Sequence, residues 1–437
     1  MKEVKVGLIG FGTVGQGVVK LLRQNQKDIE ARLGGRIALA GVADKDWRRP
    51  RQVALDKKFR RADGYQLIAD PEVKIIIELV GNFPGVKEMI IDALRAGKMV
   101  VTANKALLAK YGDEIFAVAK KSGADIYFGA SVAGGIPILR VLREGLAANR
   151  IQAIYGIVNG TCNYILTRMQ EADLEYAEAL KEAQARGYAE ANPEADVEGI
   201  DASHKLAILL RLGFGMSVPI EKIFRKGISR LSHLDLQAAS ELGYRIKLLA
   251  VARESEGRLE ARVHPTLIPE SSMLANVRGV YNAVYVRGNF VGPTLFYGQG
   301  AGMEATASAV MSDVMELARN ILQGRRAGRL RPEGYAALNP HGLRLEPMDD
   351  LVGPYYLRAW VKDQPGVLAK IAGILGKHMI SINSVIQREV RDGKSVPIII
   401  ITHQALEANI QKAVREINRL KVVLNPVQLI RIATELE

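Results

Sequence analysis

The densest group of chemically active side chains lies in the segment GYAEANPEADVEGIDASHK, at residues 187–205. Pro193 and Gly199 interrupt regular structure there, so a loop should end where a helix begins near Asp201. On that helix Asp201 and Lys205 are one turn apart on one face. A lysine held by a carboxylate can exchange a proton with a carbonyl group that undergoes hydride transfer. An exposed ion pair at a helix start has the same spacing, so spacing alone leaves both interpretations open.

A second lysine, Lys105, follows a short apolar run at residues 99–102. The run predicts a strand, and nucleotide sites lie at the carboxyl edge of parallel sheets. Lys105 could therefore work beside a bound nucleotide, or it could be a solvent-facing charge.

Small and amide side chains form another candidate group, in the segment NGTCNY at residues 159–164. Gly160 and Thr161 could frame a substrate, or the segment could cap a helix that begins near Asn163. Cys162 has no obvious base beside it, so a buried thiol fits it better than a nucleophile. The six histidines show no metal-ligand spacing such as H-E-x-x-H, so we expect no catalytic transition metal.

A glycine-rich turn follows a β-branched apolar run at residues 4–9 and precedes a helical pattern. Its spacing, G-x-G-x-x-G, lets the pyrophosphate of a dinucleotide approach the backbone at the positive end of the helix. Many structural turns share this spacing, but the flanking strand and helix favour dinucleotide binding. The expected cofactor contacts are Gly10, Phe11, Gly12, Thr13, Val14 and Gly15.

The residues after the second expected strand, at 37–42, bear on the choice between NAD and NADP. Asp44 could accept a hydrogen bond from the 2′-hydroxyl group of NAD. Lys45 and the three arginines at residues 48–51 could instead hold the 2′-phosphate of NADP, or they could face solvent. The sequence leaves both cofactors open.

These candidate residues need a scaffold, and the sequence predicts an α/β chain. Strands alternate with helices over the N-terminal region, which indicates a Rossmann-like, doubly wound parallel sheet. The middle region mixes helices, at residues 176–185 and 202–211, with antiparallel strands, as in an α+β catalytic and dimerisation domain. From residue 355 the order of strands and helices is βαββαβ, which is ferredoxin-like.

The expected domain boundaries follow these changes of pattern. Residues 1–132 form an NAD(P)-binding domain. Residues 133–324 form a substrate-binding, catalytic and dimerisation domain whose last helix returns to the nucleotide domain. A basic segment with Gly and Pro, at residues 325–353, is a linker, and residues 354–437 form a C-terminal domain.

Composition limits the classes to which the chain can belong. Its 437 residues are 48% hydrophobic and 24% charged, which is typical of a globular protein of several domains. The single cysteine excludes an internal disulfide, and no apolar run is long enough to span a membrane, so we expect a cytoplasmic protein. The net charge of +13 is scattered along the chain, so neither nucleic acid nor a membrane is an expected partner.

Six segments of the chain resemble the homoserine dehydrogenase family, and together they span nearly the whole chain. They are GFGTVG, TANKALLA, ASVAGGIPI, GIVNGTCNYIL, GYAEANPEADVEGIDASHKL and GQGAGMEATASAVMSD. The fourth and fifth are the most specific. The C-terminal region resembles an ACT regulatory domain, with DQPGVL at residues 363–368 as its strand-to-helix turn.

The resemblance implies reversible NAD(P)H-dependent reduction of L-aspartate 4-semialdehyde to L-homoserine, on the route to threonine and methionine. It makes Lys205 the proton donor, with Lys105 assisting beside the nicotinamide. It implies that Glu190 holds the amino group of homoserine. The full set of implied substrate contacts is Glu190, Asp196, Asp201, Thr161 and Gly160, and Gly302 joins the cofactor contacts.

The family also implies a monovalent cation, typically sodium, on backbone oxygens of the ASVAGGIPI loop. In this sequence the oxygens would be those of Val132, Gly134 and Ile136. The chain departs from the family at Gly129, where glutamate is usual, and this weakens the expectation of a sodium site. Gln299 and Ala305, where arginine and proline are usual, likewise weaken the cofactor contact near Gly302.

Two alternatives to an active homoserine dehydrogenase stay open. The chain could reduce another small aldehyde, or it could be a catalytically silent amino-acid sensor. The intact acids and lysines argue against the sensor, since a silent relative should lose them. The ACT resemblance further implies feedback inhibition by threonine, bound between paired domains near residues 363–367 and 380–384, and hence a homodimer or homotetramer.

Overall fold

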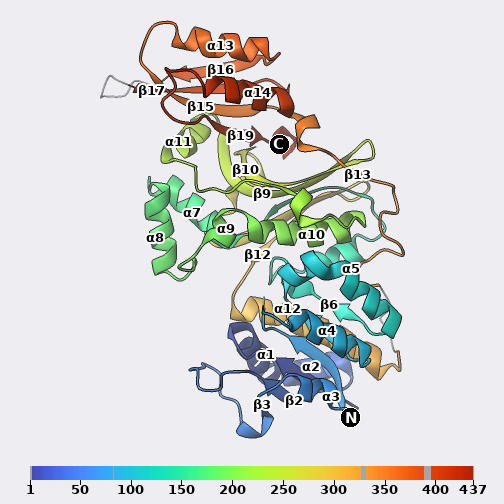
Figure 1. The fold of residues 1–437 in the computed structure, drawn as a ribbon. Coiled ribbons are helices and arrows are strands. Elements are labelled where there is room, and N and C mark those ends of the chain that lie inside the picture. Colours follow the sequence, from blue (N-terminus) through green and yellow to red (C-terminus); the bar gives the residue numbers. More distant parts are fainter. Residues whose placement is uncertain (1, 82, 326–330, 388–394, 437) are drawn as a thin grey trace. The chain divides into compact units, whose positions relative to one another are not determined.

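The computed structural model describes residues 2–81, 83–325, 331–387 and 395–436, and it divides into two compact units. The first unit comprises Met1–Val158, Asp201–Ile223 and Tyr281–Leu343. The second comprises Asn159–Ile200, Phe224–Val280 and Arg344–Glu437. Each unit is therefore built from segments that are far apart in the sequence, as the colours in Figure 1 show.

A six-stranded parallel sheet lies in the first unit, with the strand order β3-β2-β1-β4-β5-β6. Its strands are β1 (Glu3–Ile9), β2 (Arg36–Ala43), β3 (Arg60–Arg61), β4 (Val73–Glu78), β5 (Met99–Thr102) and β6 (Ile126–Tyr127). Successive strands are added on one side of β1 as far as β3 and then on its other side from β4 onwards, and dinucleotides bind where the strand order reverses in this way. This confirms the doubly wound, Rossmann-like fold expected from the alternating pattern.

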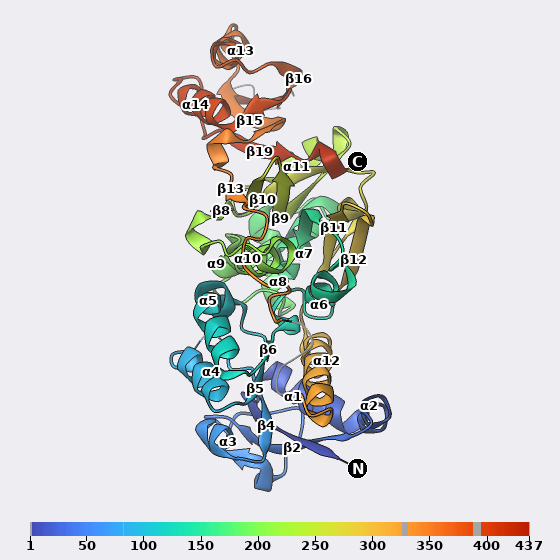
Figure 2. The ribbon, with the colours of Figure 1, turned by 90° about the vertical axis from the view of Figure 1, so that its right-hand side faces the viewer.

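Helices cover both faces of this sheet (Figure 2). One face carries α3 (Tyr65–Ala69), α4 (Val86–Arg95) and α5 (Lys105–Ser122), and the other carries α1 (Thr13–Gln24), α2 (Gln26–Leu33) and α12 (Met303–Leu322). Although α12 comes much later in the chain, it packs closely on α1. Gly17 permits this approach, because a Cβ atom there would lie 2.6 Å from the carbonyl oxygen of Met303.

The rest of the first unit is an antiparallel ladder with a buried helix. Strand β11 (Tyr281–Gly288) pairs with both β7 (Ile151–Ile157) and β12 (Gly292–Gln299). Helix α6 (Ile138–Arg140) continues into a π-helical turn at Val141–Gly145. Helix α10 (Ile200–Phe214) is buried on nearly every side, although it carries Asp201, Lys205 and Arg211. Any charged side chain on α10 must therefore find a partner.

A long antiparallel hairpin forms the centre of the second unit. Its strands are β9 (Tyr244–Ser255) and β10 (Arg258–Pro269), and β8 (Phe224–Arg225), β13 (Arg344–Leu345) and β19 (Gln428–Ile432) also pair with β10. The helices of this part are α7 (Gly160–Glu171), α8 (Tyr176–Ala185), α9 (Glu194–Val197) and α11 (His233–Glu241).

The C-terminal part of the second unit has the expected βαββαβ order, which confirms a ferredoxin-like domain. Its elements are β15 (Tyr355–Lys362), α13 (Val367–Lys377), β16 (Ile382–Gln387), β17 (Ser395–Thr402), α14 (Glu407–Ile417) and β19. The strands lie in the antiparallel order β19-β15-β17-β16, and a short ladder joins β14 (Val352–Gly353) to β18 (Ala405–Leu406). Apolar side chains of both helices and the sheet fill its core.

Some elements differ from the expectation. The helical pattern after the strand at 99–102 predicts a helix over residues 111–122, but α5 starts at Lys105. Strand β9 was not expected, because its residues do not alternate cleanly between polar and apolar. The apolar pattern of residues 422–432 predicts one strand, but β19 begins only at Gln428, since Pro426 lacks the N–H group that a ladder needs. Residues 388 and 389 of an expected strand, and residues 326–330 of the expected linker, lie outside the described residues.

One buried ion pair joins the C-terminal domain to α11 within the second unit. The Asp235 carboxylate accepts hydrogen bonds from Arg358, at 2.6 Å from Nε and 2.9 Å from the terminal nitrogen. The Tyr356 hydroxyl group donates to the same carboxylate at 3.0 Å. Asp235 also closes a capping box with Ser232 at the start of α11. The two-pronged geometry fixes orientation as well as distance.

We predict that Arg358→Met strongly destabilises the protein. The substitution leaves the fully buried Asp235 without its cation, and breaking a buried pair in this way costs about 3–5 kcal/mol. Arg415→Met, on the exposed face of α14, is the control and should change the free energy of unfolding by about 0.5 kcal/mol or less. Equal unfolding free energies for the two variants would contradict the role assigned to the pair.

Candidate active site

A single buried carboxylate joins the two candidate catalytic lysines in the first unit. The Lys205 ammonium nitrogen lies 2.6 Å from Oδ2 of Asp201, and the Lys105 nitrogen lies 2.8 Å from Oδ1. Lys205 also donates to the carbonyl oxygen of Val158 at 2.6 Å. Asp201 and Lys205 are 7% and 8% exposed, so the exposed-ion-pair interpretation of their spacing is wrong.

The end of strand β5 positions Lys105. Asn104 caps α5, since its side-chain oxygen accepts from the N–H group of Leu107 at 3.1 Å, while its amide nitrogen donates to Gly81 at 2.7 Å. Lys105 is thereby the first residue of α5, at the carboxyl edge of the sheet, with its side chain 41% exposed. One end of this lysine is fixed by the fold and the other by Asp201.

Charge compensation keeps Asp201 ionised. Burial opposes ionisation, but the ammonium groups of Lys205 and Lys105 outweigh it and hold the pKa of the Asp201 carboxyl group well below its usual range. A carboxylate that stays charged at neutral pH favours the protonated form of both lysines. The arrangement can therefore present an ammonium proton to a substrate oxygen.

The glycine turn after β1 has the geometry that a pyrophosphate requires. Gly10 has a φ of +96°, and a Cβ atom at Gly15 would overlap the carbonyl oxygen of Gly10. Gly12 precedes α1 without any side-chain cap, so the first turn of α1 offers its N–H groups to a ligand. The residues expected to bind the cofactor thus lie at the positive end of a helix.

Asp44 holds this turn in place. Its carboxylate accepts from the N–H group of Phe11 at 2.7 Å and contacts Arg51 at 3.1 Å. Arg51 donates to the carbonyl oxygen of Phe11 at 3.2 Å and lies over the Trp47 ring. Lys45 lies over the Phe83 ring, with its nitrogen 4.0 Å from the ring centre. Asp44, the residue expected to accept a hydrogen bond from the ribose of NAD, is therefore already paired with Arg51.

The loop that carries Val132, Gly134 and Ile136 turns sharply against the end of β12. Ala133 and Gly134 have φ values of +52° and +25°, and the N–H group of Gly135 donates to Gln299 at 2.9 Å. A Cβ atom at Gly134 would lie 2.7 Å from the carbonyl oxygen of Gly300. Gly302, with a φ of +112°, then precedes α12 as its N-cap residue.

Asp313 occupies the space beside Gly129. Its carboxylate accepts from the Gly129 N–H group at 2.6 Å, and a Cβ atom at residue 129 would lie 2.9 Å from the carboxylate oxygen. Burial raises the pKa of Asp313 to about 6. An acidic group is thus present next to this backbone position although residue 129 itself has no side chain.

In the second unit, a separate group of polar side chains connects the start of α7 with the loop at residues 187–198, called the acidic loop below. Asn159 donates to the Asp196 carboxylate at 2.8 Å, and the Cys162 thiol donates to the Asp196 carbonyl oxygen at 3.2 Å. The hydroxyl group of Thr161, next to Gly160, donates to the carbonyl oxygen of Tyr188 at 2.7 Å. Cys162 is fully buried, as expected of a structural thiol.

Glu190 lies in the same loop, and its side chain is exposed. Its backbone oxygen accepts from the Gln184 side chain at 3.1 Å, which anchors the loop to α8. The carboxylate is therefore placed by the backbone and remains accessible to a ligand.

The sequence interpretation missed two residues that support the site. Glu78 is buried and accepts from Thr102 at 2.6 Å and from the Val80 N–H group at 2.7 Å, which shapes the loops after β4 and β5. Burial raises the pKa of Glu78. Asp313 is the other. Glu78 could have been found from the sequence, because it is an acid at the end of the apolar run of β4. Nothing in the sequence around Asp313 indicated its contact with Gly129.

Comparison with known proteins assigns this arrangement to a family. Family models match residues 137–315 (homoserine dehydrogenase), 10–129 (homoserine dehydrogenase, NAD binding domain) and 355–422 (ACT domain). The homoserine dehydrogenase of Neisseria gonorrhoeae is 45% identical over 431 residues, which cover 99% of each chain. The chain belongs to the homoserine dehydrogenase family. It is accordingly an NAD(P)-dependent oxidoreductase with a C-terminal ACT domain.

Solved structures of this family agree with the fold. The crystal structure of a homoserine dehydrogenase from Thiobacillus denitrificans has a TM-score of 0.92 and 44% identity, and the match covers 99% of both chains. A hyperthermophilic archaeal homoserine dehydrogenase in complex with NADPH has a TM-score of 0.60 and 28% identity over 72% of this chain and 97% of its own.

Two kinds of feature are absent from the described residues. No helix among them is long and apolar enough to cross a membrane. No cluster of three or more His, Cys, Asp or Glu residues in that part of the chain could hold a metal ion.

The glycine turn yields a prediction with a matched control. Gly15→Ala should lower the thermal midpoint of the cofactor-free enzyme, because the new methyl group overlaps the carbonyl oxygen of Gly10. Gly12→Ala should leave that midpoint unchanged, since nothing lies within 4 Å of its Cβ position and its φ is −75°. Both variants should bind NADPH more weakly in a fluorescence titration. Unchanged NADPH affinity in both would show that the turn does not hold the cofactor.

Proposed function

We propose that the chain reversibly reduces L-aspartate 4-semialdehyde to L-homoserine, with Lys205 as the proton donor. The observation that carries this assignment is the buried Lys105–Asp201–Lys205 arrangement. The bound nicotinamide supplies the hydride that adds to the aldehyde carbon. Lys205 then gives one proton to the aldehyde oxygen, so that aldehyde, reduced cofactor and proton become alcohol and oxidised cofactor.

Asp201 and Lys105 assist Lys205 in different ways. Asp201 keeps Lys205 protonated and oriented, and the carbonyl oxygen of Val158 restricts the ammonium group further. Lys105 is the more exposed of the two lysines and begins α5 at the carboxyl edge of the nucleotide sheet. From there it stabilises negative charge on the substrate oxygen beside the nicotinamide.

The substrate's amino-acid end is assigned to residues of the acidic loop and of α7. Glu190 is exposed and takes the ammonium group, which only a carboxylate can neutralise. Asp196 orders this region through Asn159 and Cys162, and Thr161 and Gly160 line the start of α7. Asp201 completes the set from α10.

We assign NADP as the preferred cofactor, with NAD as an alternative. The Asp44 carboxylate would repel a 2′-phosphate if it were unpaired, but Arg51 lies 3.1 Å from it and neutralises its charge. Lys45 and the arginines at residues 48 and 49 add positive charge to the same loop. An NADPH complex is known for a member of the family.

Sodium is assigned to the backbone oxygens of Val132, Gly134 and Ile136. The left-handed turn at Ala133 and Gly134 redirects successive carbonyl groups, and Asp313 supplies a buried acid beside Gly129. Against this, the carbonyl oxygen of Ile136 already accepts from Ile138 at 2.8 Å. A bound cation would hold the loop at residues 132–136 in place without taking part in proton transfer.

The ACT domain is assigned to regulation by threonine. Gly366, with a φ of +83°, makes the turn after β15 at which α13 begins, and strand β16 is the edge of the domain's sheet. An unpaired edge strand can pair with a second copy of itself. We therefore propose a homodimer or homotetramer in which threonine binds between ACT domains.

The proton-donor role of Lys205 is tested by Lys205→Met. General acid catalysis contributes about 10²–10⁴-fold, so kcat for aspartate semialdehyde reduction should fall by that factor while NADPH affinity is kept. Lys222→Met, at an exposed position, is the control. Full activity in Lys205→Met would refute the role, and faster turnover of another small aldehyde by the wild-type enzyme would refute the substrate.

The cofactor and effector assignments are tested by steady-state kinetics with NADPH and NADH, each with and without threonine. Arg51→Leu should raise KM for NADPH about tenfold more than KM for NADH, since loss of one charge-assisted contact is worth roughly 1.4 kcal/mol or more. Equal changes for both cofactors would contradict the assignment.

Threonine should inhibit the wild-type enzyme with either cofactor, and absence of inhibition would contradict the proposed effector.

A further inference from the structure

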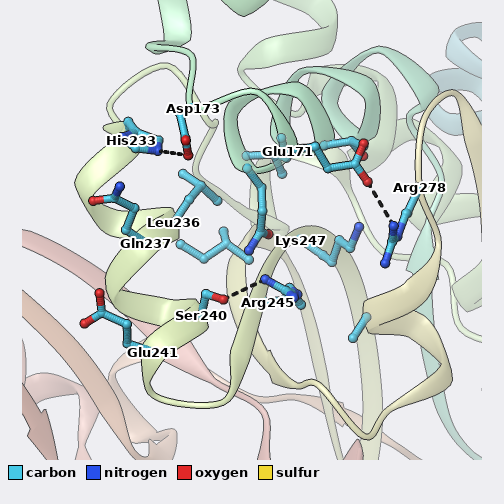
Figure 3. Close-up of a pocket in the computed structure, with 15 residues that line it drawn as sticks. Glu171, Asp173, His233, Leu236, Gln237, Ser240, Glu241, Arg245, Lys247 and Arg278 are labelled. Carbon is cyan, nitrogen blue, oxygen red and sulfur yellow. Dashed lines mark hydrogen bonds and ion pairs between the residues drawn. The ribbon is translucent and has the colours of Figure 1, made fainter.

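A cavity of about 410 Å³ lies within the second unit, between α7, α11 and strand β9 (Figure 3). The residues that line it include none of those assigned above to catalysis, cofactor or substrate. Its volume is near the lower end of the range of ligand sites, about 300–1,000 Å³. The cavity therefore suits a small metabolite and is too small for a dinucleotide.

Charges of opposite sign line opposite sides of the cavity. Figure 3 shows Asp173 and Glu241 on one side, with His233 hydrogen-bonded to Asp173 at 2.9 Å. Arg245, Lys247 and Arg278 lie on the other side, where Glu171 pairs with Arg278. Arg245 is held by Ser240 at 2.9 Å and Glu270 at 3.0 Å, and Arg278 is held by Glu171 at 3.1 Å. Arg245 is thus held by two partners, whereas the pair of Arg278 with Glu171 is more exposed.

Lys247 is the buried member of that side. It is 5% exposed, and its ammonium nitrogen donates to two neutral acceptors, the Asn163 side chain at 3.1 Å and the Val277 carbonyl oxygen at 2.5 Å. Within the described ranges, no carboxylate lies at ion-pair distance from this nitrogen. Burial lowers the pKa of Lys247 to about 7, and Arg278 and Arg245 add to that effect. A buried amine without a counter-ion at the wall of a cavity would be stabilised in its ammonium form by an anionic ligand group, so the site favours a ligand that carries one.

We propose that this cavity binds a free α-amino acid. The ligand's carboxylate meets Lys247 and Arg245, and its ammonium group meets the acidic side at Asp173 and Glu241. A phosphate or a dicarboxylate would carry its second negative charge towards those acids, whereas a zwitterion matches both sides. The volume leaves room for an uncharged side chain.

The two helices that line the cavity, α7 and α11, also carry residues with roles elsewhere in the second unit. Helix α7 begins with Gly160 and Thr161, which the proposed mechanism places at the substrate. Helix α11 carries Asp235, whose carboxylate holds Arg358 of the ACT domain. An amino acid bound between these two helices would therefore contact elements of the catalytic and the regulatory regions together.

Isothermal titration calorimetry of the full-length enzyme tests the site, with L-threonine, L-isoleucine and L-methionine as probes. We expect at least one probe to bind. For that probe, Arg245→Gln and Lys247→Met should each raise the dissociation constant at least tenfold. Lys181→Met, on the exposed surface of α8, should leave it unchanged. Because Lys247→Met could disturb folding, Arg245→Gln, whose side chain is 30% exposed, provides the independent test.

Two further arms separate this cavity from the ACT domain and define the ligand class. Asp363→Ala, in the exposed ACT turn, should keep the binding that Arg245→Gln weakens. The 2-hydroxy acid analogue of the binding probe, which lacks the ammonium group, should bind at least tenfold more weakly. The proposal is overturned if no probe binds, if Arg245→Gln keeps wild-type affinity, if only Asp363→Ala abolishes binding, or if the hydroxy acid binds equally well.

Discussion

The Asp201 carboxylate, held between two ammonium groups, is the interaction on which the candidate active site depends. Helix α10 is buried on nearly every side, so a lone acid or a lone lysine on it would be strongly destabilising. Together the charges compensate one another, and they also fix α5 to α10 through Lys105. The same carboxylate that makes burial tolerable therefore sets the protonation state and the position of the proposed proton donor.

Local patterns predicted one half of this arrangement, and tertiary contacts decided the other. The i,i+4 spacing of Asp201 and Lys205 is visible in the sequence, as is the position of Lys105 after a strand. That Lys105 reaches Asp201, and that burial excludes the exposed pair, depends on the packing of helices distant in the chain. Asp313 shows the same limit, because it meets Gly129 across 184 residues.

The fold was predictable where periodicity is strong and less so elsewhere. Alternating strands and helices indicated the parallel sheet and the βαββαβ domain, whereas β9 was missed because burial on both faces removes the two-residue period. The role of Asp44 was only partly visible. The parallel pairing of β1 with β2 places the N–H group of Gly10 2.8 Å from the carbonyl oxygen of Ala43. Asp44, the next residue, can therefore accept from Phe11 and contact Arg51.

The pH dependence of aspartate semialdehyde reduction by Asp201→Asn tests the central claim most directly. The amide keeps the size of the side chain but removes the charge that favours the ammonium form of both lysines. The account predicts a kcat about 10²–10⁴-fold below the wild-type value and an alkaline limb of the pH–rate profile that moves to lower pH. A wild-type kcat with an unmoved alkaline limb would show that Asp201 does not control the proton donor.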